Sequence, residues 1–303
     1  MIEAVGLAKT FGARKAVDGL SFQVQPGVVT GFLGPNGAGK STTMRLMIEL
    51  DRGDGLTKFA GQRYRDIERP MRRVGVLLEA KAFHPTRTAR NHLRMLAAAN
   101  AIAPKRADDV LALVGLDSVA DKKPKSFSLG MGQRLGLAAA LLGEPEVLML
   151  DEPANGLDPQ GITWLRDFLK AYAAAGNTVF ASSHLLAEMQ LMADHLIVIG
   201  RGRLLADTTI GEFVARSSHT TVVVRSPESA RLTELLAGRG AEVAVEADGM
   251  LTVTGMTQEQ VGDLAFAERV LVHELTTRVA TLEEAFLEVT AGEEEFGQSG
   301  GPS

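Results

Sequence analysis

The sequence predicts an α/β fold with a mixed, mainly parallel sheet, followed by a smaller α+β domain. Short apolar runs alternate with helical patterns over about the first two hundred residues, which is typical of a parallel sheet covered on both faces. A glycine-rich segment separates one of these runs from a helix, and the pattern changes near residue 217. A length of 303 residues is enough for one large domain or two modest ones.

The apolar runs between residues 28 and 199 are predicted to be buried strands of the sheet. They are Val28–Leu33, Val74–Leu78, Val147–Leu150, Val179–Ala181 and Leu196–Ile199. The helices expected between them are Lys40–Glu49, Arg90–Ala101, Arg134–Leu142, Gln160–Ala175 and Leu185–Met192. Two half-buried strands, Glu3–Leu7 and Leu20–Val24, are expected to form an antiparallel addition at the N-terminus. Residues 81–142 are almost wholly helical in pattern and predict a helical insertion.

The region after residue 217 has the strand and helix order of a ferredoxin-like unit. The expected elements are strand Thr221–Arg225, helix Ala230–Arg239, strands Glu242–Glu246 and Leu251–Thr254, helix Gln258–Ala267 and strand Val270–Glu274. An amphipathic helix, Thr281–Val289, is expected to follow. We therefore predict a first domain over 1–217, a second over 218–290 and a disordered tail, rich in Glu, Gly and Ser, over 291–303.

Composition excludes several classes of function. The formal net charge is −5, so the chain lacks the basic character of general DNA- or RNA-binding proteins, and no nucleic-acid partner is expected. The sequence contains no cysteine, which excludes disulfides and zinc–thiolate sites. No window approaches the roughly 18 apolar residues of a membrane-spanning helix. A role at a membrane would therefore depend on a partner.

The glycine-rich segment matches the phosphate-binding pattern G-x-x-x-x-G-K-[ST]. It consists of Gly34, Pro35, Asn36, Gly37, Ala38, Gly39, Lys40, Ser41 and Thr42. Glycines allow backbone N–H groups to turn toward phosphates, Lys40 reaches the terminal phosphates, and the Ser41 hydroxyl ligates Mg²⁺. An ordinary glycine-rich turn is the alternative, but the strand before and the helix after favour a nucleoside triphosphate site.

A second motif is the buried strand that ends in Asp151 and Glu152. A carboxylate at the carboxyl edge of a parallel strand, close to a phosphate loop, can hold Mg²⁺, and a neighbouring one can deprotonate the attacking water. We assign Asp151 to the metal and Glu152 to the water. Without the phosphate loop, the two acids would be better explained as a turn with no chemistry.

With these motifs in order, residues 1–215 resemble the ATP-binding subunit of an ABC transporter, a P-loop NTPase cassette. Phe127–Arg134 reads Phe-Ser-Leu-Gly-Met-Gly-Gln-Arg and stands where that family has its signature. The resemblance implies that Ser128 and Gly130, at a helix N-terminus, complete the ATP site of the opposite subunit. It therefore implies a homodimer that encloses two ATP molecules with Mg²⁺.

Further residues take their expected roles from the resemblance alone. Asp158 matches the loop that touches the opposite subunit, and His184 matches the histidine that contacts the γ-phosphate and orders Glu152 and water. Phe11 matches an aromatic residue that stacks on adenine, with a core phenylalanine as the alternative. Glu79 stands where the family usually has a metal-binding glutamine, and its carboxylate could still bind Mg²⁺ while adding negative charge beside the γ-phosphate.

The form Ser-Leu-Gly-Met, with Leu129 where glycine is common, is similar to the daunorubicin- and bacitracin-type exporter branch. This implies an ATP-hydrolysing subunit that exports a drug, antibiotic or lipid-like compound with a separately encoded multi-span permease. It also implies a cytoplasmic protein held at the inner face of the membrane by that permease. Two alternatives remain: a soluble ABC-type ATPase that acts on the ribosome or DNA, and a weakly hydrolysing nucleotide-dependent regulator.

Overall fold

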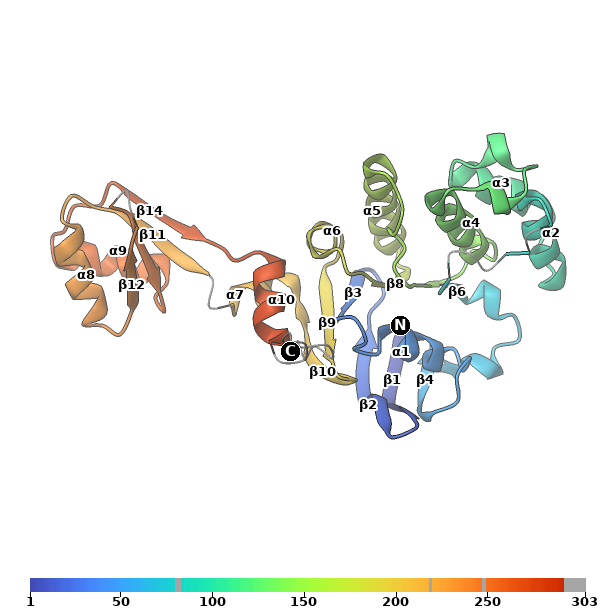
Figure 1. Cartoon of the computed structure of the whole chain (residues 1–303), viewed down its shortest axis with the longest axis horizontal. Helices are drawn as coiled ribbons and strands as arrows, with labels where there is room; N and C mark the ends of the chain where they lie inside the picture. Colours follow the sequence, from blue (N-terminus) through green and yellow to red (C-terminus); the bar gives the residue numbers. More distant parts are fainter. Residues whose placement is uncertain (80–82, 85, 218–219, 247–248, 292–303) are drawn as a thin grey trace, which may run out of the picture. The chain divides into compact units, whose positions relative to one another are not determined.

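The computed structural model describes residues 1–79, 83–84, 86–217, 220–246 and 249–291, and the chain in it divides into two compact units (Figure 1). One unit includes Met1–Thr208 and the other comprises Thr209–Val289. The boundary predicted after residue 217 is therefore too late. Of the tail predicted over 291–303, residues 292–303 lie outside the described residues.

The early boundary follows from α7 (Ile210–Ala215), which the sequence analysis did not separate from the first domain. Thr209 and Glu212 form a reciprocal capping box at the start of this helix. At its far end, Val214 O accepts a hydrogen bond from Thr220 Oγ1 (3.2 Å), and Ser217 Oγ donates to Glu288 Oε2 (2.7 Å). These bonds join α7 to the second unit.

The first unit is built on a sheet with the strand order β10-β9-β3-β8-β7-β6. Its strands are β3 (Val29–Leu33), β6 (Val74–Leu77), β7 (Val147–Leu150), β8 (Thr178–Ser182), β9 (His195–Gly200) and β10 (Arg203–Thr209). The pairs β9–β3, β3–β8, β8–β7 and β7–β6 are parallel, as predicted. Strand β10, with its exposed and polar residues, was not predicted.

A second sheet, with the order β2-β1-β4-β5, is antiparallel and confirms the expected N-terminal addition. Its strands are β1 (Ile2–Phe11), β2 (Arg14–Val24), β4 (Asp54–Phe59) and β5 (Gln62–Arg63). Strand β4 was not predicted because only Thr57 and Phe59 of its six residues are buried. The two predicted strands are longer than expected and meet in a hairpin at residues 12–13.

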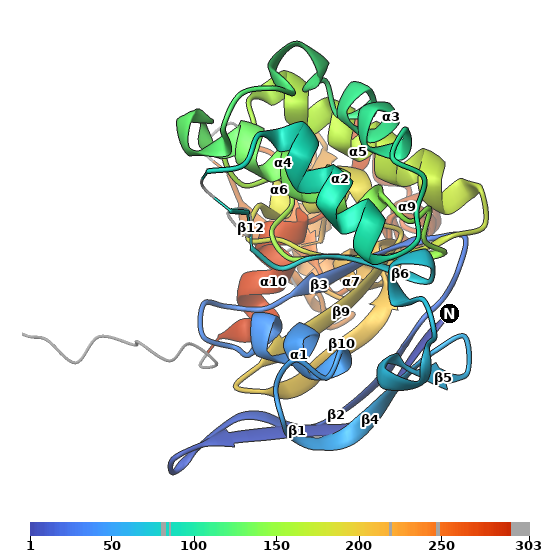
Figure 2. The same ribbon diagram turned by 90° about the vertical axis from the view of Figure 1, so that its right-hand side faces the viewer.

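Helices cover the main sheet, and α2, α3 and α4 lie together on the side of the unit away from β1, β2 and β4 (Figures 1 and 2). The helices are α1 (Lys40–Met47), α2 (Ala89–Ala99), α3 (Arg106–Leu113), α4 (Leu129–Leu141), α5 (Pro159–Ala174) and α6 (Leu186–Met192). Short 3₁₀ turns occupy Tyr64–Asp66, Pro70–Arg72, Asp117–Val119 and Pro124–Ser126. The described part of 81–142 is therefore helical, as expected.

Helix α4 begins at Leu129, before the start at Arg134 expected from its pattern, and Ser128 stands at its N-terminus, as the resemblance implied. The Ser128 hydroxyl accepts a hydrogen bond from Met131 N (3.2 Å), which satisfies one N–H group of the first turn. The helix then packs closely on β6 through glycines. A Cβ atom on Gly75 would lie 2.2 Å from Ala140 O, and one on Gly136 would lie 2.6 Å from Leu77 Cδ1.

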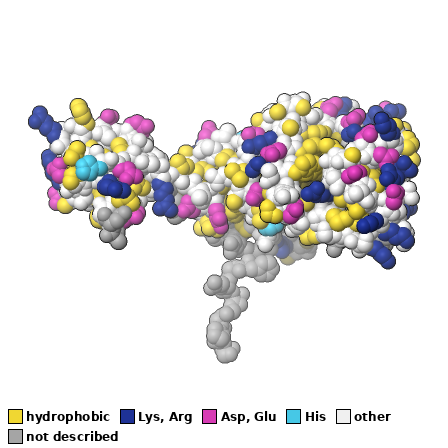
Figure 3. Space-filling model, turned by 90° about the horizontal axis from the view of Figure 1, so that it is seen from above, with side chains coloured by type: hydrophobic (Ala, Val, Ile, Leu, Met, Phe, Trp, Pro, Cys, Tyr) yellow, Lys and Arg dark blue, Asp and Glu magenta, His cyan; other side chains and the backbone are white. Residues whose placement is uncertain are grey.

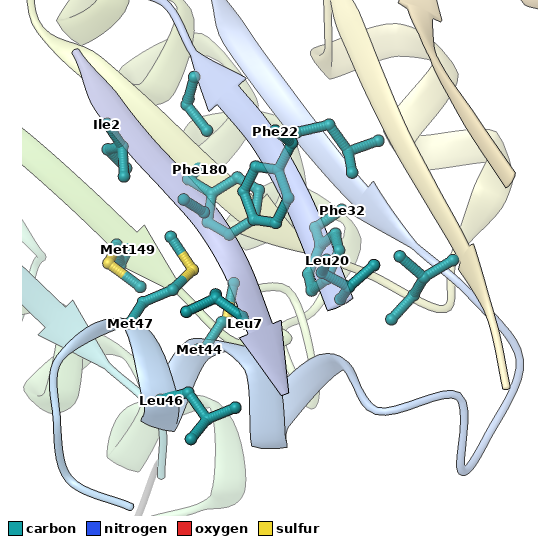
Figure 4. Close-up of a cluster of buried hydrophobic side chains, with 14 of the residues drawn as sticks. Ile2, Leu7, Leu20, Phe22, Phe32, Met44, Leu46, Met47, Met149 and Phe180 are labelled. Carbon is teal, nitrogen blue, oxygen red and sulfur yellow. The ribbon is translucent and has the colours of Figure 1, made fainter. Parts of the chain in front are cut away.

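The core of the first unit joins its two sheets and α1 (Figure 4). Phe22 of β2 packs against Phe32 and Phe180 of the main sheet, with ring centroids 5.9 and 5.7 Å away. Met44 and Met47 of α1 are fully buried in the same cluster. Burial of a large apolar side chain contributes about 1.5–3 kcal/mol, so this core fixes α1, and the loop before it, against the sheet.

The second unit has the antiparallel sheet order β12-β13-β11-β14, which confirms the ferredoxin-like prediction. Its elements after α7 are β11 (Thr221–Arg225), α8 (Ser229–Ala237), β12 (Glu242–Val245), β13 (Leu251–Thr254), α9 (Gln258–Ala267), β14 (Glu274–Arg278) and α10 (Leu282–Thr290). The strand predicted over Val270–Glu274 is wrong. Val270 packs in the core of this unit as part of a connection, and the pairing with β11 begins only at Glu274.

Candidate nucleotide site

The glycine-rich segment forms the turn between β3 and α1, and two of its glycines fit only because they lack a side chain. Gly39 has φ 103°, and a Cβ atom there would lie 2.3 Å from Ala16 O. A Cβ atom on Gly34 would lie 2.5 Å from Ile199 O. Such a turn presents main-chain N–H groups at the N-terminus of α1, where the helix dipole favours an anion.

Lys40, the first residue of α1, folds back over this loop. Its Nζ donates hydrogen bonds to Gly34 O (2.6 Å) and Pro35 O (3.4 Å). Burial lowers the pKa of Lys40, and the nearby carboxylates of Glu152 and Asp151 oppose part of that shift. The half-buried ammonium group is therefore fixed against the loop, and the two carboxylates favour its charged form.

A cavity of about 640 Å³ opens over the loop. It is lined by Phe11, Arg14, Ala16, Asp151, Glu152 and residues 35–42. The structure thus brings together residues that are more than a hundred positions apart in the sequence. Phe11 is 52% exposed at the end of β1, so the alternative of a core phenylalanine is wrong.

Asp151 and Glu152 follow β7 at the edge of the cavity, and Ser182 at the end of β8 connects them. The Ser182 hydroxyl donates to Asp151 Oδ1 (2.5 Å) and accepts from Glu152 N (2.9 Å). Ser182 is fully buried, so this bridge is shielded from competing water. The two acids are therefore held with their main chain fixed relative to β8.

The carboxylate of Glu152 is oriented by His184. Glu152 Oε2 accepts from His184 N (3.1 Å) and lies 2.6 Å from His184 Nδ1. Glu152 itself has φ 50°, the left-handed region that residues with side chains seldom adopt. His184 does not line the cavity over the loop, but its contact places it beside the acid that does.

The oxygen donors at this edge suit Mg²⁺, which takes few protein ligands and keeps several water or phosphate oxygens. Ser41 and Asp151 both line the cavity. Within the described ranges, there is no group of three or more His, Asp or Glu side chains placed to hold a metal ion. A metal at this edge would therefore need oxygen ligands from water or phosphate as well. Glu79 is not brought to this cavity; its side chain is 72% exposed and lies 4.0 Å from Arg45 Nη1.

Ser128, Gly130 and Asp158 lie together in a different cavity, of about 280 Å³. Gly130 packs so closely on the loop before α5 that a Cβ atom there would lie 2.5 Å from Gly156 O. Asp158 caps α5 by accepting from Gly161 N (2.9 Å) and lies 3.8 Å from Arg134 Nη2. The described lining of this cavity shares no residue with that of the cavity over the glycine-rich loop.

Two residues near the site were not singled out from the sequence. Arg14 donates from Nη2 to Gly37 O (3.2 Å) and lines the cavity over the loop. Gln133, 4% exposed, donates from Nε2 to Glu152 O (2.8 Å). The available signal for Gln133 was its place in the signature segment Phe127–Arg134, to which the sequence analysis gave no role for this residue.

Comparison with known proteins identifies the family. A model of the ABC transporter family matches residues 17–155. The daunorubicin/doxorubicin resistance ATP-binding protein DrrA of Streptomyces peucetius is 32% identical over 303 residues, which cover 95% of this chain and 92% of that protein. This chain belongs to the ABC transporter ATP-binding proteins. Its first unit is an ATP-binding cassette, and the protein is an ATPase coupled to transport.

Other comparisons agree with this identification. The bacitracin transport ATP-binding protein BcrA of Bacillus licheniformis is 42% identical over 211 residues, or 68% of this chain and 69% of that protein. A solved ATP-binding subunit of an ABC transporter has a TM-score of 0.65 at 28% identity, covering 71% of this chain and 92% of its own. The predicted similarity to daunorubicin- and bacitracin-type proteins is confirmed. Residues 220–283 of this ATP-binding protein match a family described as a domain of unknown function.

Proposed function

We propose that this ATP-binding protein works as a homodimer that closes on two ATP molecules with Mg²⁺ and drives a separately encoded multi-span permease. The observation that carries the proposal is the separation of two cavities in one unit. The cavity over the glycine-rich loop holds Lys40 and Glu152, whereas Ser128 and Gly130 line another. Each becomes half of a complete site when a second copy supplies the other half.

Within each site, the chain's own residues would position and activate the reactants. Lys40 and the N–H groups of the loop bind the phosphates of ATP, and Phe11 stacks on the adenine. Ser41 and Asp151 hold Mg²⁺, which when bound neutralises charge on the phosphate oxygens. Glu152 accepts the proton of the attacking water, while His184 orients its carboxylate and contacts the γ-phosphate.

Glu79 lines a third cavity of the cassette, with a volume of about 360 Å³. Most of its lining is apolar and comes from β6, α2, α4 and their neighbours, including Val76, Leu78, Phe83, Leu96 and Leu135. We assign this groove to a helix of the permease. Its apolar floor suits a helix end, and the rim charges of Glu79 and Arg45 provide polar partners. Metal binding by Glu79 would require a movement toward the loop.

Export is favoured because DrrA is named for drug resistance and BcrA for bacitracin transport. We therefore propose that the cargo is a drug, an antibiotic or a lipid-like compound. No helix within the described residues is long and apolar enough to cross a bilayer. In this proposal the protein sits in the cytoplasm and reaches the inner face of the membrane through its permease. The visible face of the cassette mixes acidic, basic and apolar side chains (Figure 3), which does not favour the nucleic-acid alternative.

The test is ATPase activity of the purified chain as a function of protein concentration, with and without Mg²⁺. Turnover that requires Mg²⁺ and rises faster than linearly with concentration is expected, because each site needs two chains. Linear turnover, together with a monomer on size-exclusion chromatography, would contradict the shared sites. Absence of turnover with ATP binding retained would favour the weakly hydrolysing regulator.

Glu152→Gln tests the chemical assignment. The variant should bind ATP, form a stable ATP-bound dimer and lose turnover by about a hundredfold or more, because a neutral amide cannot accept the proton. Glu68→Gln is the matched control, since Glu68 is exposed and lines neither nucleotide cavity. Ordinary turnover in Glu152→Gln would show that another group is the base.

A further inference from the structure

Gln133 is a buried polar side chain on a helix that otherwise packs through apolar residues and glycines. Its Nε2 donates to the main-chain carbonyl of Glu152 at 2.8 Å, across 19 positions of sequence. We infer that Gln133 is a positioning residue for ATP hydrolysis, which holds the main chain of Glu152 and ties it to the N-terminus of α4. The inference rests on the proposed role of Glu152 as the base.

The main chain of Glu152 needs such a hold because it has φ 50°. A residue other than glycine stays in this left-handed backbone conformation only where the surrounding structure holds it there. Here its N–H donates to Ser182 Oγ (2.9 Å), and its carbonyl oxygen accepts from Asn155 N (3.1 Å) as well as from Gln133. Asn155 belongs to the following turn, so Gln133 supplies the link from the carbonyl to another element.

The direction of the Glu152 carboxylate depends on this main-chain conformation. His184 holds Oε2 at the far end of the side chain. If the peptide after Glu152 turned, the carboxylate would swing away from the position that His184 and the cavity define. Catalysis by a base is sensitive to shifts of about 1 Å. Gln133 therefore acts on the rate through Glu152, without touching ATP or water.

The same helix end carries the second nucleotide half-site. Ser128 caps α4, and Gly130 packs against Gly156, which lies in the loop between Glu152 and α5. Gln133 follows on the next turn of the helix and reaches Glu152. In the closed pair, Ser128 would face one ATP and Glu152 the other. Gln133 thus joins the two half-sites of a single chain through one rigid helix.

The experiment compares full-length Gln133→Met with Gln133→His, using steady-state ATPase kinetics with Mg-ATP. Methionine has a side chain of similar length but no N–H donor. We expect kcat to fall about tenfold, which corresponds to the loss of one hydrogen bond. The KM for ATP should change by less than about twofold. Histidine retains a ring N–H donor and should keep most of kcat. Gln62→Met, at an exposed glutamine of β5, is the matched control and should behave as wild type.

A double mutant separates positioning from a general structural role. In the Glu152→Gln background, Gln133→Met should cause little further loss of turnover, because the base through which it acts is already gone. Wild-type kcat in Gln133→Met, a rise in KM alone, or an equal further loss in the double mutant would each overturn the inference. If wild type does not hydrolyse ATP, or Glu152→Gln hydrolyses it normally, the proposed function fails instead.

Discussion

Tyr172 on α5 shows how burial sets the chemistry of a single residue. Its hydroxyl donates to the main-chain carbonyl of Pro145, just before β7, and burial raises the pKa of Tyr172 to about 12. The unfolded chain ionises this group near its ordinary value of about 10. The neutral form therefore stabilises the fold below pH 10, and that stabilisation is lost as the pH rises toward 12.

Tyr172→Phe should reveal this dependence. At about pH 8 we expect the variant to lose about 1 kcal/mol of unfolding free energy with the hydrogen bond. From pH 10 to 12 the wild type should lose roughly 1–2 kcal/mol that the variant does not lose, because the ring is only partly buried and solvent screens part of the effect. Urea unfolding across this pH range measures both effects. Burial also raises the pKa of Tyr64, so Tyr64→Phe should remove a smaller part of the same pH dependence. Equal slopes for wild type and Tyr172→Phe would contradict the assignment.

The residues of the site differ in how far the sequence could predict them. The glycine-rich loop is a local pattern, so Lys40 and Ser41 were predictable from spacing alone. Asp151 could be paired with them only because strand ends meet at one edge of a parallel sheet. Gln133 was not predictable, because its hydrogen bond to Glu152 depends on how α4 packs on the sheet. Glu79 could be placed just after the strand β6, but its position beside Arg45 could not be predicted.

At the level of elements, the close packing of α4 on β6 depends on small residues. A Cβ atom on Gly75 would lie 2.2 Å from Ala140 O and 2.8 Å from Pro145 Cγ. Gly75→Ala must therefore push the helix away from the strand and is expected to destabilise the cassette by about 1–3 kcal/mol. Because α4 carries Ser128 and Gln133, ATPase activity should fall as well. Urea unfolding and turnover measure the two effects.

Gly211→Ala is the matched control for that substitution. Gly211 lies in α7, where an added Cβ would meet no atom within 4 Å. Alanine should stabilise a helix by about 0.5–1 kcal/mol relative to glycine. The two glycine-to-alanine changes should thus have opposite signs. A neutral Gly75→Ala would mean that α4 can move outward without loss.

The predicted elements were reliable where burial is strong on both faces. Strands β3, β7 and β8 are buried at every position, and their apolar runs were recognised. Strand β10 was missed because most of its residues are exposed or half-exposed, and helix α7 was missed because it has only six residues. The last strand of the second unit was misplaced because Val270 and Val272 gave the stronger β signal. They pack in the core, while the threonine-rich Glu274–Arg278 forms the ladder with β11.

At the level of the whole molecule, the division into two units predicts where the chain can be cut. A fragment of residues 209–291 should fold cooperatively and be more stable than one of residues 218–291 by about 1–2 kcal/mol. The shorter fragment loses the bonds of Thr220 to Val214 and of Ser217 to Glu288. Urea unfolding followed by circular dichroism would show the difference. Equal unfolding free energies for the two fragments would support the domain boundary predicted after residue 217.

The contacts of Lys40 with Gly34 and Pro35 change what nucleotide binding means for this cassette. The ammonium group is half-buried and already hydrogen-bonded to the loop in the free protein. When the nucleotide binds, phosphate oxygens would replace the carbonyl oxygens of Gly34 and Pro35 as acceptors for the Lys40 ammonium group, which is already ordered. Part of the conformational entropy of this side chain is therefore lost on folding and not on nucleotide binding. The loop therefore has its phosphate-binding shape before the nucleotide arrives, and its own lysine helps to hold that shape.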